Sequence, residues 1–253
     1  MLKPRHVSNV AKFRRLKSSR NLRGPNSRAR PAACRCRDEE QPQNTPTIGT
    51  FSMEPIANMK NLGTATISGD LEVDRAIATL VLAFETDPVA RWMYHARDQY
   101  LLHIPRLFRA LGADSFEVGA AHSLSDGAGI AIWLPPGVQG DGARVEAVIA
   151  DSLTRDMQRD VSAVFEMTEH YRPTEEHWYL SLIGVEGSQR NKGYGAALLA
   201  HGLQQCDREH RAAYLWSSNK QNTSLYQRHG FEVVATFQVG SSPPIYPMLR
   251  ASR

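Results

Sequence analysis

The chain has 253 residues, and its proportions of hydrophobic (42%) and charged (22%) residues are typical of a globular protein. No apolar stretch approaches the roughly 20 residues that a membrane-spanning helix needs, and none near Met1 resembles a secretory signal, so we expect neither a membrane protein nor a secreted one. Three cysteines cannot all pair, and Cys34-x-Cys36 lacks the second ligand pair of a zinc site, so we expect a reducing compartment and no bound metal.

The net charge of +4 hides an uneven distribution. Residues 1–37 contain twelve Lys/Arg and no Asp or Glu, whereas the rest of the chain contains 18 Lys/Arg and 26 Asp/Glu. The basic segment is rich in Arg, Ser and Asn and lacks periodic apolar residues, so we expect it to be disordered. A polar, proline-containing linker follows it. The sequence therefore predicts a disordered basic extension and linker at 1–52 and a folded domain at 53–253.

Three interpretations of the basic segment are open. It can be an organelle transit peptide, because such peptides are rich in Arg and Ser and poor in acidic residues. It can be an arm that contacts nucleic acid, although no interleaved aromatic residues favour this. It can also be a removable leader or a mis-assigned start, in which case the protein begins at Met53. We expect a cytoplasmic protein, or an organellar one if the segment is a transit peptide.

Hydrophobic periodicity predicts alternating helices and strands from residue 64 onward. The first expected elements are a strand at 64–68, a helix capped by Asp70, a helix at about 89–111 with Leu101 and Ile104 inward, antiparallel strands at 116–123 and 129–134, and a long helix at about 143–170. The later ones are a strand at 177–185, a helix after Gly195, a strand at 213–218, a helix near Asn222, and a hairpin of 231–239 with 245–249. This mixture predicts an α/β (α+β) domain in which helices flank a mostly antiparallel central sheet.

The most informative segment is the loop after the strand at 177–185. It reads Arg190-x-x-Gly193-x-Gly195 and leads into a helix. Glycines let the backbone approach a phosphate closely, and the first turn of a helix leaves N–H groups free to bind an anion. Position 198 is Leu, so the third glycine of a dinucleotide fingerprint is missing, and no Gly-Lys-Ser/Thr is present. The loop is therefore a pyrophosphate loop of another kind or a plain strand–helix turn.

A second motif follows downstream, Asn222-x-x-x-Tyr226-x-x-x-Gly230-Phe231. In the order and spacing of these two motifs the chain resembles the GNAT superfamily of N-acetyltransferases, from about Met53 to the C-terminus. The loop looks like that family's acetyl-CoA pyrophosphate signature, and the second motif looks like the one that ends in a general acid. Asn191, where many members carry glycine, and Glu186-Gly187-Ser188, in place of a proline-containing turn, depart from the pattern. The segments 132–137 and 171–173 are similar to the branch that includes puromycin N-acetyltransferase.

The resemblance implies an enzyme that moves an acetyl group from acetyl-CoA directly to the primary amine of a small molecule. It implies that the strands at 177–185 and 213–218 splay apart around the pantetheine arm. It implies contacts with acetyl-CoA at the following residues: Val185, Arg190, Lys192, Gly193, Tyr194, Gly195, Ala196 and Asn222. Asn222 is also expected to cap its helix, a role compatible with the contact. Tyr226 is implied as the general acid that protonates the leaving thiolate, the alternative being a core tyrosine beside Phe231.

Other roles stay open. Glu176, His177 and Glu186 lie near the strand that carries the general base in many members, but water can also deprotonate an amine, so no base is assigned. Four aromatic residues either line the acceptor pocket or belong to the core: Trp92, Tyr94, Trp133 and Trp178. The alternative functions are a non-catalytic acyl-CoA-binding protein, acetylation of a peptide or protein amine, and a nucleic-acid-associated protein recruited by its basic arm. We expect a monomer or a homodimer.

Overall fold

The computed structural model describes residues 67–253 except 69–71, 125 and 139. The predictions for the extension at 1–52 and for a domain start at residue 53 lie outside these residues. The strand predicted at 64–68 is described only at its end, Ile67–Ser68.

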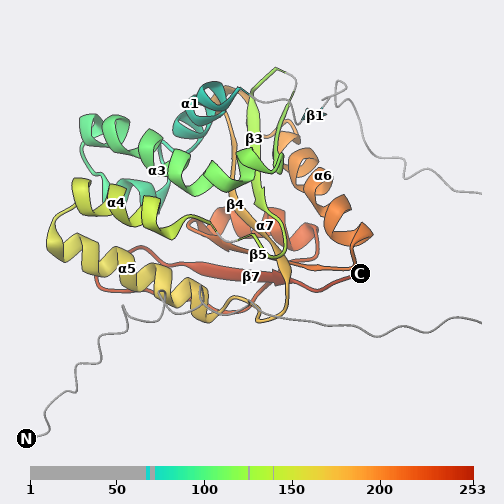
Figure 1. Ribbon diagram of the computed structural model, residues 1–253. Helices are drawn as coiled ribbons and strands as arrows, with labels where there is room; N and C mark the ends of the chain where they lie inside the picture. The colour runs from blue at the N-terminus through green and yellow to red at the C-terminus, as the bar shows by residue number, and fades with distance from the viewer. Residues whose placement is uncertain (1–66, 69–71, 125, 139) are drawn as a thin grey trace, which may run out of the picture. The chain divides into compact units, whose positions relative to one another are not determined.

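The described residues form a mixed α/β fold with a seven-stranded sheet in the order β1-β2-β3-β4-β5-β7-β6 (Figure 1). The strands are β1 (Ile67–Ser68), β2 (Ala121–Leu124), β3 (Gly129–Leu134), β4 (His177–Val185), β5 (Ala212–Ser217), β6 (Glu232–Val233) and β7 (Tyr246–Arg250). The helices are α1 (Val73–Ala83), α2 (Pro88–Met93), α3 (Arg97–Glu117), α4 (Gly142–Ser152), α5 (Arg155–His170), α6 (Tyr194–Arg208) and α7 (Lys220–Arg228), with a 3₁₀ turn η1 (Gly187–Gln189). Every strand pair is antiparallel except β4 with β5, which confirms the predicted fold class.

The parallel pair β4–β5 is short. It pairs His177 with Ala212, Trp178 with Ala213 and Tyr179 with Tyr214, and no further pair of these two strands is formed among the described residues. β4 continues to Val185 against β3, while β5 continues to Ser217 against β7. The two strands therefore splay apart beyond Tyr179, as the resemblance implied.

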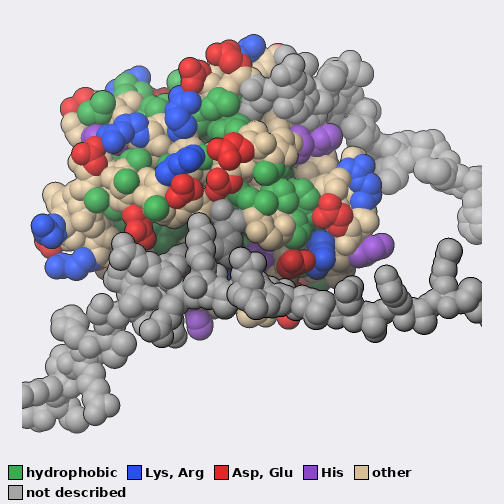
Figure 2. All heavy atoms as spheres, viewed as in Figure 1, with side chains coloured by type: hydrophobic (Ala, Val, Ile, Leu, Met, Phe, Trp, Pro, Cys, Tyr) green, Lys and Arg blue, Asp and Glu red, His purple; other side chains and the backbone are tan. Residues whose placement is uncertain are grey.

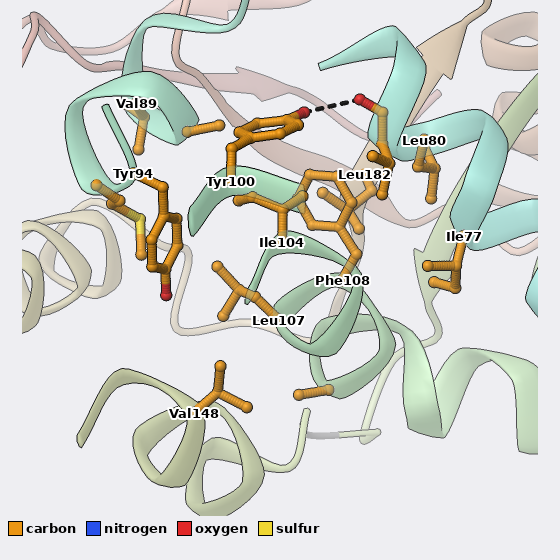
Figure 3. Packing of buried hydrophobic residues seen from close by; sticks show 14 of the residues in the cluster. Ile77, Leu80, Val89, Tyr94, Tyr100, Ile104, Leu107, Phe108, Val148 and Leu182 are labelled. Carbon is orange, nitrogen blue, oxygen red and sulfur yellow. Dashed lines mark hydrogen bonds between the residues drawn. The ribbon is translucent and has the colours of Figure 1, made fainter. Parts of the chain in front are cut away.

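Helices cover both faces of this sheet (Figure 1). α1 and α3 pack against β3 and β4 on one face, and α6 packs against the same strands on the other. On the first face the Tyr100 hydroxyl donates to the carbonyl of Val81 at 2.7 Å and joins α3 to α1 (Figure 3). α5 covers β5, because the rings of Phe165 and Trp216 meet edge to face.

Two predicted helices are each divided in the structure. The helix expected at 89–111 is α2 followed by α3, because the chain leaves helical geometry at Tyr94, whose hydroxyl lies 2.6 Å from that of Ser152. α3 then starts in a new phase at Arg97, which leaves Leu101 48% exposed rather than inward. α3 also extends to Glu117, so the strand predicted from residue 116 starts only at Ala121.

The helix expected at 143–170 is α4 followed by α5. Leu153 is extended, and the Thr154 hydroxyl caps α5 by accepting from the Met157 N–H at 3.4 Å. The helical spacing of apolar residues continues through this break, so the sequence pattern did not reveal it. The predicted cap residue Asp70 lies outside the described residues, and Glu72, at the N-cap position of α1, makes no side-chain cap.

The contact between α6 and β3 leads to a first prediction. Replacing Gly202 with Ala should destabilise the fold, although alanine usually stabilises a helix by about 0.5–1 kcal/mol. A Cβ at Gly202 would lie 2.2 Å from Nε1 of the fully buried Trp133. Because overpacking costs about 1–3 kcal/mol, we expect the free energy of unfolding to fall by about 1–2 kcal/mol in a urea titration.

Gly195→Ala in the same helix is the matched control, since its Cβ would meet Leu225 at an ordinary 3.6 Å. Equal stability of the two variants would show that the indole moves aside without cost.

Candidate functional site

The loop between β4 and α6 leaves the N-terminus of α6 uncapped by any described side chain. Asn191 (φ 63°) and Gly193 (φ 84°) both adopt left-handed backbone. Glycine adopts this geometry freely, and asparagine tolerates it better than most residues, which explains why Asn191 can replace glycine. The Ala197 N–H bonds to the carbonyl of Gly193 at 3.0 Å, and the N–H groups before it have no carbonyl partner within the helix. This arrangement suits an anion.

Gly195 is a glycine that the protein's own packing does not require. A Cβ there would lie 3.6 Å from Leu225 and 3.8 Å from Val185, which are ordinary contacts. Its φ also lies outside the left-handed region, unlike that of Gly193. Gly195 lies in the first turn of α6, and its neighbours are Val185 at the end of β4 and Leu225 of α7.

The two basic side chains of the loop have partners within the protein. The Arg190 guanidinium donates to the carbonyl of Ala83 at 2.6 Å and so ties the loop to the end of α1. The Lys192 ammonium donates to Oε1 of Gln189 at 2.7 Å. Both residues are exposed, so their charges remain beside the N-terminus of α6.

The last residues of β4 direct backbone groups into the space between the splayed strands. The Glu186 N–H donates to the carbonyl of Ala128 at 2.8 Å, toward β3. Backbone groups alternate in direction along an antiparallel strand, so the N–H and C=O of Val185 face away from β3. They face the side from which β5 has separated.

A cavity occupies this gap and holds about 940 Å³ of empty space, including its opening to solvent. It is lined from the strands by residues of β4 and β5, and from the helices by apolar residues of α3 and α5. Asp87, Ser218, Asn222 and Tyr226 are among the polar residues of the lining. Asp87 is the only side chain with a formal charge among the described residues of the lining.

Tyr226 lines the cavity and also packs in the core. Its ring meets that of Phe231 edge to face with centroids 6.1 Å apart, and the residue is 7% exposed. Burial, and to a smaller extent the charge of Asp87, raise the pKa of its phenol well above the usual range. The hydroxyl therefore stays protonated at neutral pH.

Asp87 is the site residue that sequence reasoning missed. It caps α2, accepting with Oδ1 from the N–H groups of Val89 and Ala90, both at 3.0 Å. Its Oδ2 accepts a hydrogen bond from the Ser218 hydroxyl. Burial raises the pKa of this carboxyl, although all three hydrogen bonds oppose the shift. Asp87 before Pro88 is a recognisable sequence signal for the start of a helix. Its contact with Ser218, which lies 131 positions later, could not be predicted from the sequence.

Several candidate residues lie elsewhere. The cap of α7 is Asn219, which accepts from the Gln221 N–H at 2.9 Å, so the prediction that Asn222 caps the helix is wrong. Glu176 pairs with Arg211 at 3.0 Å, and neither His177 nor Glu186 lines the cavity. Of the four aromatic candidates, only Trp92 lines the cavity.

α7 is anchored by an ion pair in which the arginine is buried and the aspartate is partly exposed. Arg250 of β7 is 3% exposed and binds both carboxylate oxygens of Asp207 in α6, at 2.7 and 2.9 Å. It also donates to the carbonyl of His229, at the end of α7, at 3.0 Å. One guanidinium thus fixes α6, α7 and β7 to each other and holds the element that carries Tyr226.

Within the described part of the chain, no helix is long and apolar enough to cross a membrane. Over the same residues, no group of three or more His, Cys, Asp or Glu side chains could hold a metal ion. On the face shown in Figure 2, acidic and basic side chains of the described residues are interspersed.

Known proteins are similar to this chain in sequence and in fold. The model of the acetyltransferase (GNAT) family matches residues 158–231, which run from α5 to the end of the second motif. An N-acetyltransferase of Schizosaccharomyces pombe, itself uncharacterised, is 27% identical over 186 residues, 62% of this chain and 69% of its own.

Solved structures share the fold. One, described as histone acetyltransferase HPA2 and related acetyltransferase from Corynebacterium glutamicum, aligns with a TM-score of 0.55 and 24% identity over 74% of this chain and 96% of its own. Arylalkylamine N-acetyltransferase 2 from Aedes aegypti aligns with a TM-score of 0.51 and 12% identity over 71% of this chain and 94% of its own. Residues 158–231 therefore match the acetyltransferase (GNAT) family, and the described residues share their fold with solved acetyltransferases.

Proposed function

We propose that the enzyme transfers an acetyl group directly from acetyl-CoA to the primary amine of a small molecule. The observation that carries this proposal is the cavity in the gap between β4 and β5, which Tyr226 and Asp87 both line. Binding of the pyrophosphate at Gly193–Ala196 and of the pantetheine arm along Val185 would leave the thioester near these two residues. Acetyl-CoA is the acyl donor that the GNAT family uses.

The uncapped N-terminus of α6 would hold the pyrophosphate through the N–H groups of Tyr194, Gly195 and Ala196. Arg190 and Lys192 would add positive charge at the rim, and Asn222 would contact the arm from α7. The backbone of Val185 would pair with the amide groups of the arm, because a strand edge offers N–H and C=O groups in the pattern that an extended chain matches.

Tyr226 would act as the general acid. Attack of a neutral amine on the thioester carbonyl gives a tetrahedral intermediate, and its collapse breaks the carbon–sulfur bond. The Tyr226 hydroxyl would give its proton to the departing thiolate, and the phenolate would regain a proton from the nitrogen that becomes the amide. The raised pKa of the phenol keeps this proton in place before reaction.

Two alternatives are disfavoured by the same cavity. A non-catalytic acyl-CoA-binding protein has no need for a protonated phenol at the end of the gap. Acetylation of a peptide amine would call for polar groups that match a peptide backbone, whereas the wall formed by α3 and α5 is apolar. A small amine therefore fits better.

The cosubstrate site is tested at Gly195. Gly195→Val should abolish the rise in melting temperature that acetyl-CoA produces, because the side chain would stand where the phosphate approaches the backbone. The fold should survive, since nothing crowds that Cβ. The matched control is Gly142→Val in the first turn of α4, where no atom lies within 4 Å and cosubstrate binding should persist. Full stabilisation of the Gly195 variant would overturn the assignment.

The general acid is tested with Tyr226→Phe, which keeps the ring beside Phe231 and removes the proton. We expect kcat to fall by roughly 10²–10⁴, the usual contribution of a positioned acid, while the affinity for acetyl-CoA changes little. Steady-state kinetics and calorimetric titration would measure both quantities.

Tyr214→Phe is the control for this experiment. It removes another buried hydroxyl, which donates to the carbonyl of Thr168 at 2.7 Å and does not line the cavity, so turnover should be normal. If Tyr226→Phe were as active as the parent and only Tyr226→Ala lost activity, through a packing cavity, Tyr226 would be a core residue alone.

A further inference from the structure

The lining of the cavity also indicates which amine it accepts, an inference that rests on the proposed function. Most of the lining is aliphatic or aromatic. From the helices on one face of the sheet it includes Phe84, Ile104, Leu107, Phe108, Leu111, Val161, Val164 and Phe165. These residues belong to α3, α5 and the end of α1, whereas the proposed phosphate site belongs to α6, across the sheet (Figure 1).

The apolar wall is therefore separate from the part of the gap that the donor would occupy. A pyrophosphate at α6 and a pantetheine arm along Val185 reach the gap from the α6 face. The space on the other face, beyond the thioester, is left for the second substrate. Removal of apolar surface from water would favour an acceptor with an apolar body there.

Asp87 lines the same cavity and lies beside Ser218. Its carboxylate receives three hydrogen bonds, from two backbone N–H groups and the Ser218 hydroxyl. A carboxylate has about four acceptor positions, so capacity for one more donor remains. Among the described residues no Lys, Arg or His forms a salt bridge with Asp87. A partly buried negative charge without a cation carries a desolvation cost, and a cationic ligand would offset that cost.

We infer that the acceptor is a primary amine with a single positive charge and an apolar body, and that Asp87 binds its ammonium group, which gives one proton to water before the neutral nitrogen attacks the thioester. The apolar body lies against α3 and α5, and the nitrogen lies near Ser218 and Tyr226. A carboxylate on the acceptor would be repelled by Asp87. A second ammonium group would lose its hydration against the apolar wall without a partner.

The first test compares acceptors that differ in charge and polarity. The release of coenzyme A thiol is measured with hexylamine, phenethylamine, phenylalanine, putrescine and a dialanine peptide. We expect kcat/KM for the two apolar amines to exceed that for the other three by about tenfold or more, because each of those leaves a charge or polar group unpaired. Equal or higher kcat/KM with phenylalanine, putrescine or the peptide would overturn the inference.

The second test is Asp87→Asn. Asparagine is as good a helix cap as aspartate, so α2 keeps its hydrogen bonds and only the charge is lost. We expect KM for the apolar amine to rise by about tenfold or more, because a desolvated charge pair is broken, while KM for acetyl-CoA stays unchanged. Asp98→Asn, at an exposed carboxylate in the first turn of α3, is the control and should alter neither.

The outcomes distinguish a failure of the proposed function from a failure of the inferred acceptor class. If no amine releases thiol, the proposed function fails, and the acceptor class falls with it. If thiol is released only with polar or acidic acceptors, the function stands and the acceptor class is wrong. An unchanged KM for the amine in Asp87→Asn, with or without a change in kcat, would show that Asp87 does not bind the ammonium.

Discussion

The separation of β4 from β5 is the constraint on which the rest of this structure depends. The strands pair over three residues and then follow different neighbours, β4 remaining with β3 and β5 with β7. A strand edge inside a protein leaves backbone N–H and C=O groups that need partners. The gap is therefore a place where an extended ligand can complete the sheet, and the proposed donor site uses backbone more than side chains.

The helices around the gap carry residues of the candidate site. α6 starts beside Val185, α7 presents Tyr226, and α2 presents Asp87 through its own cap. None of these helices could hold its position alone. The ion pair of Arg250 with Asp207 fixes α6 and α7 against β7, and Arg190 fixes the loop to α1. Charged residues outside the cavity thus join the elements that surround it.

Burial acts on Asp87 and Tyr226 of the cavity lining in the same direction. It raises the pKa of Tyr226 and that of Asp87, because removal from water disfavours each charged form. For the phenol this means that a proton is available to a leaving thiolate. For the carboxylate it means that a cationic partner would be favoured.

The sequence by itself determined the mixed fold, the strand–loop–helix at 177–208 and the second motif, because these depend on periodicity and on residues close together in the chain. It did not reveal the breaks at Tyr94 and Leu153, since apolar spacing continues through both. It also placed the cap of α7 at Asn222 instead of Asn219. The contacts of Arg190 with Ala83 and of Asp87 with Ser218 span 107 and 131 residues, and only the folded chain brings such partners together.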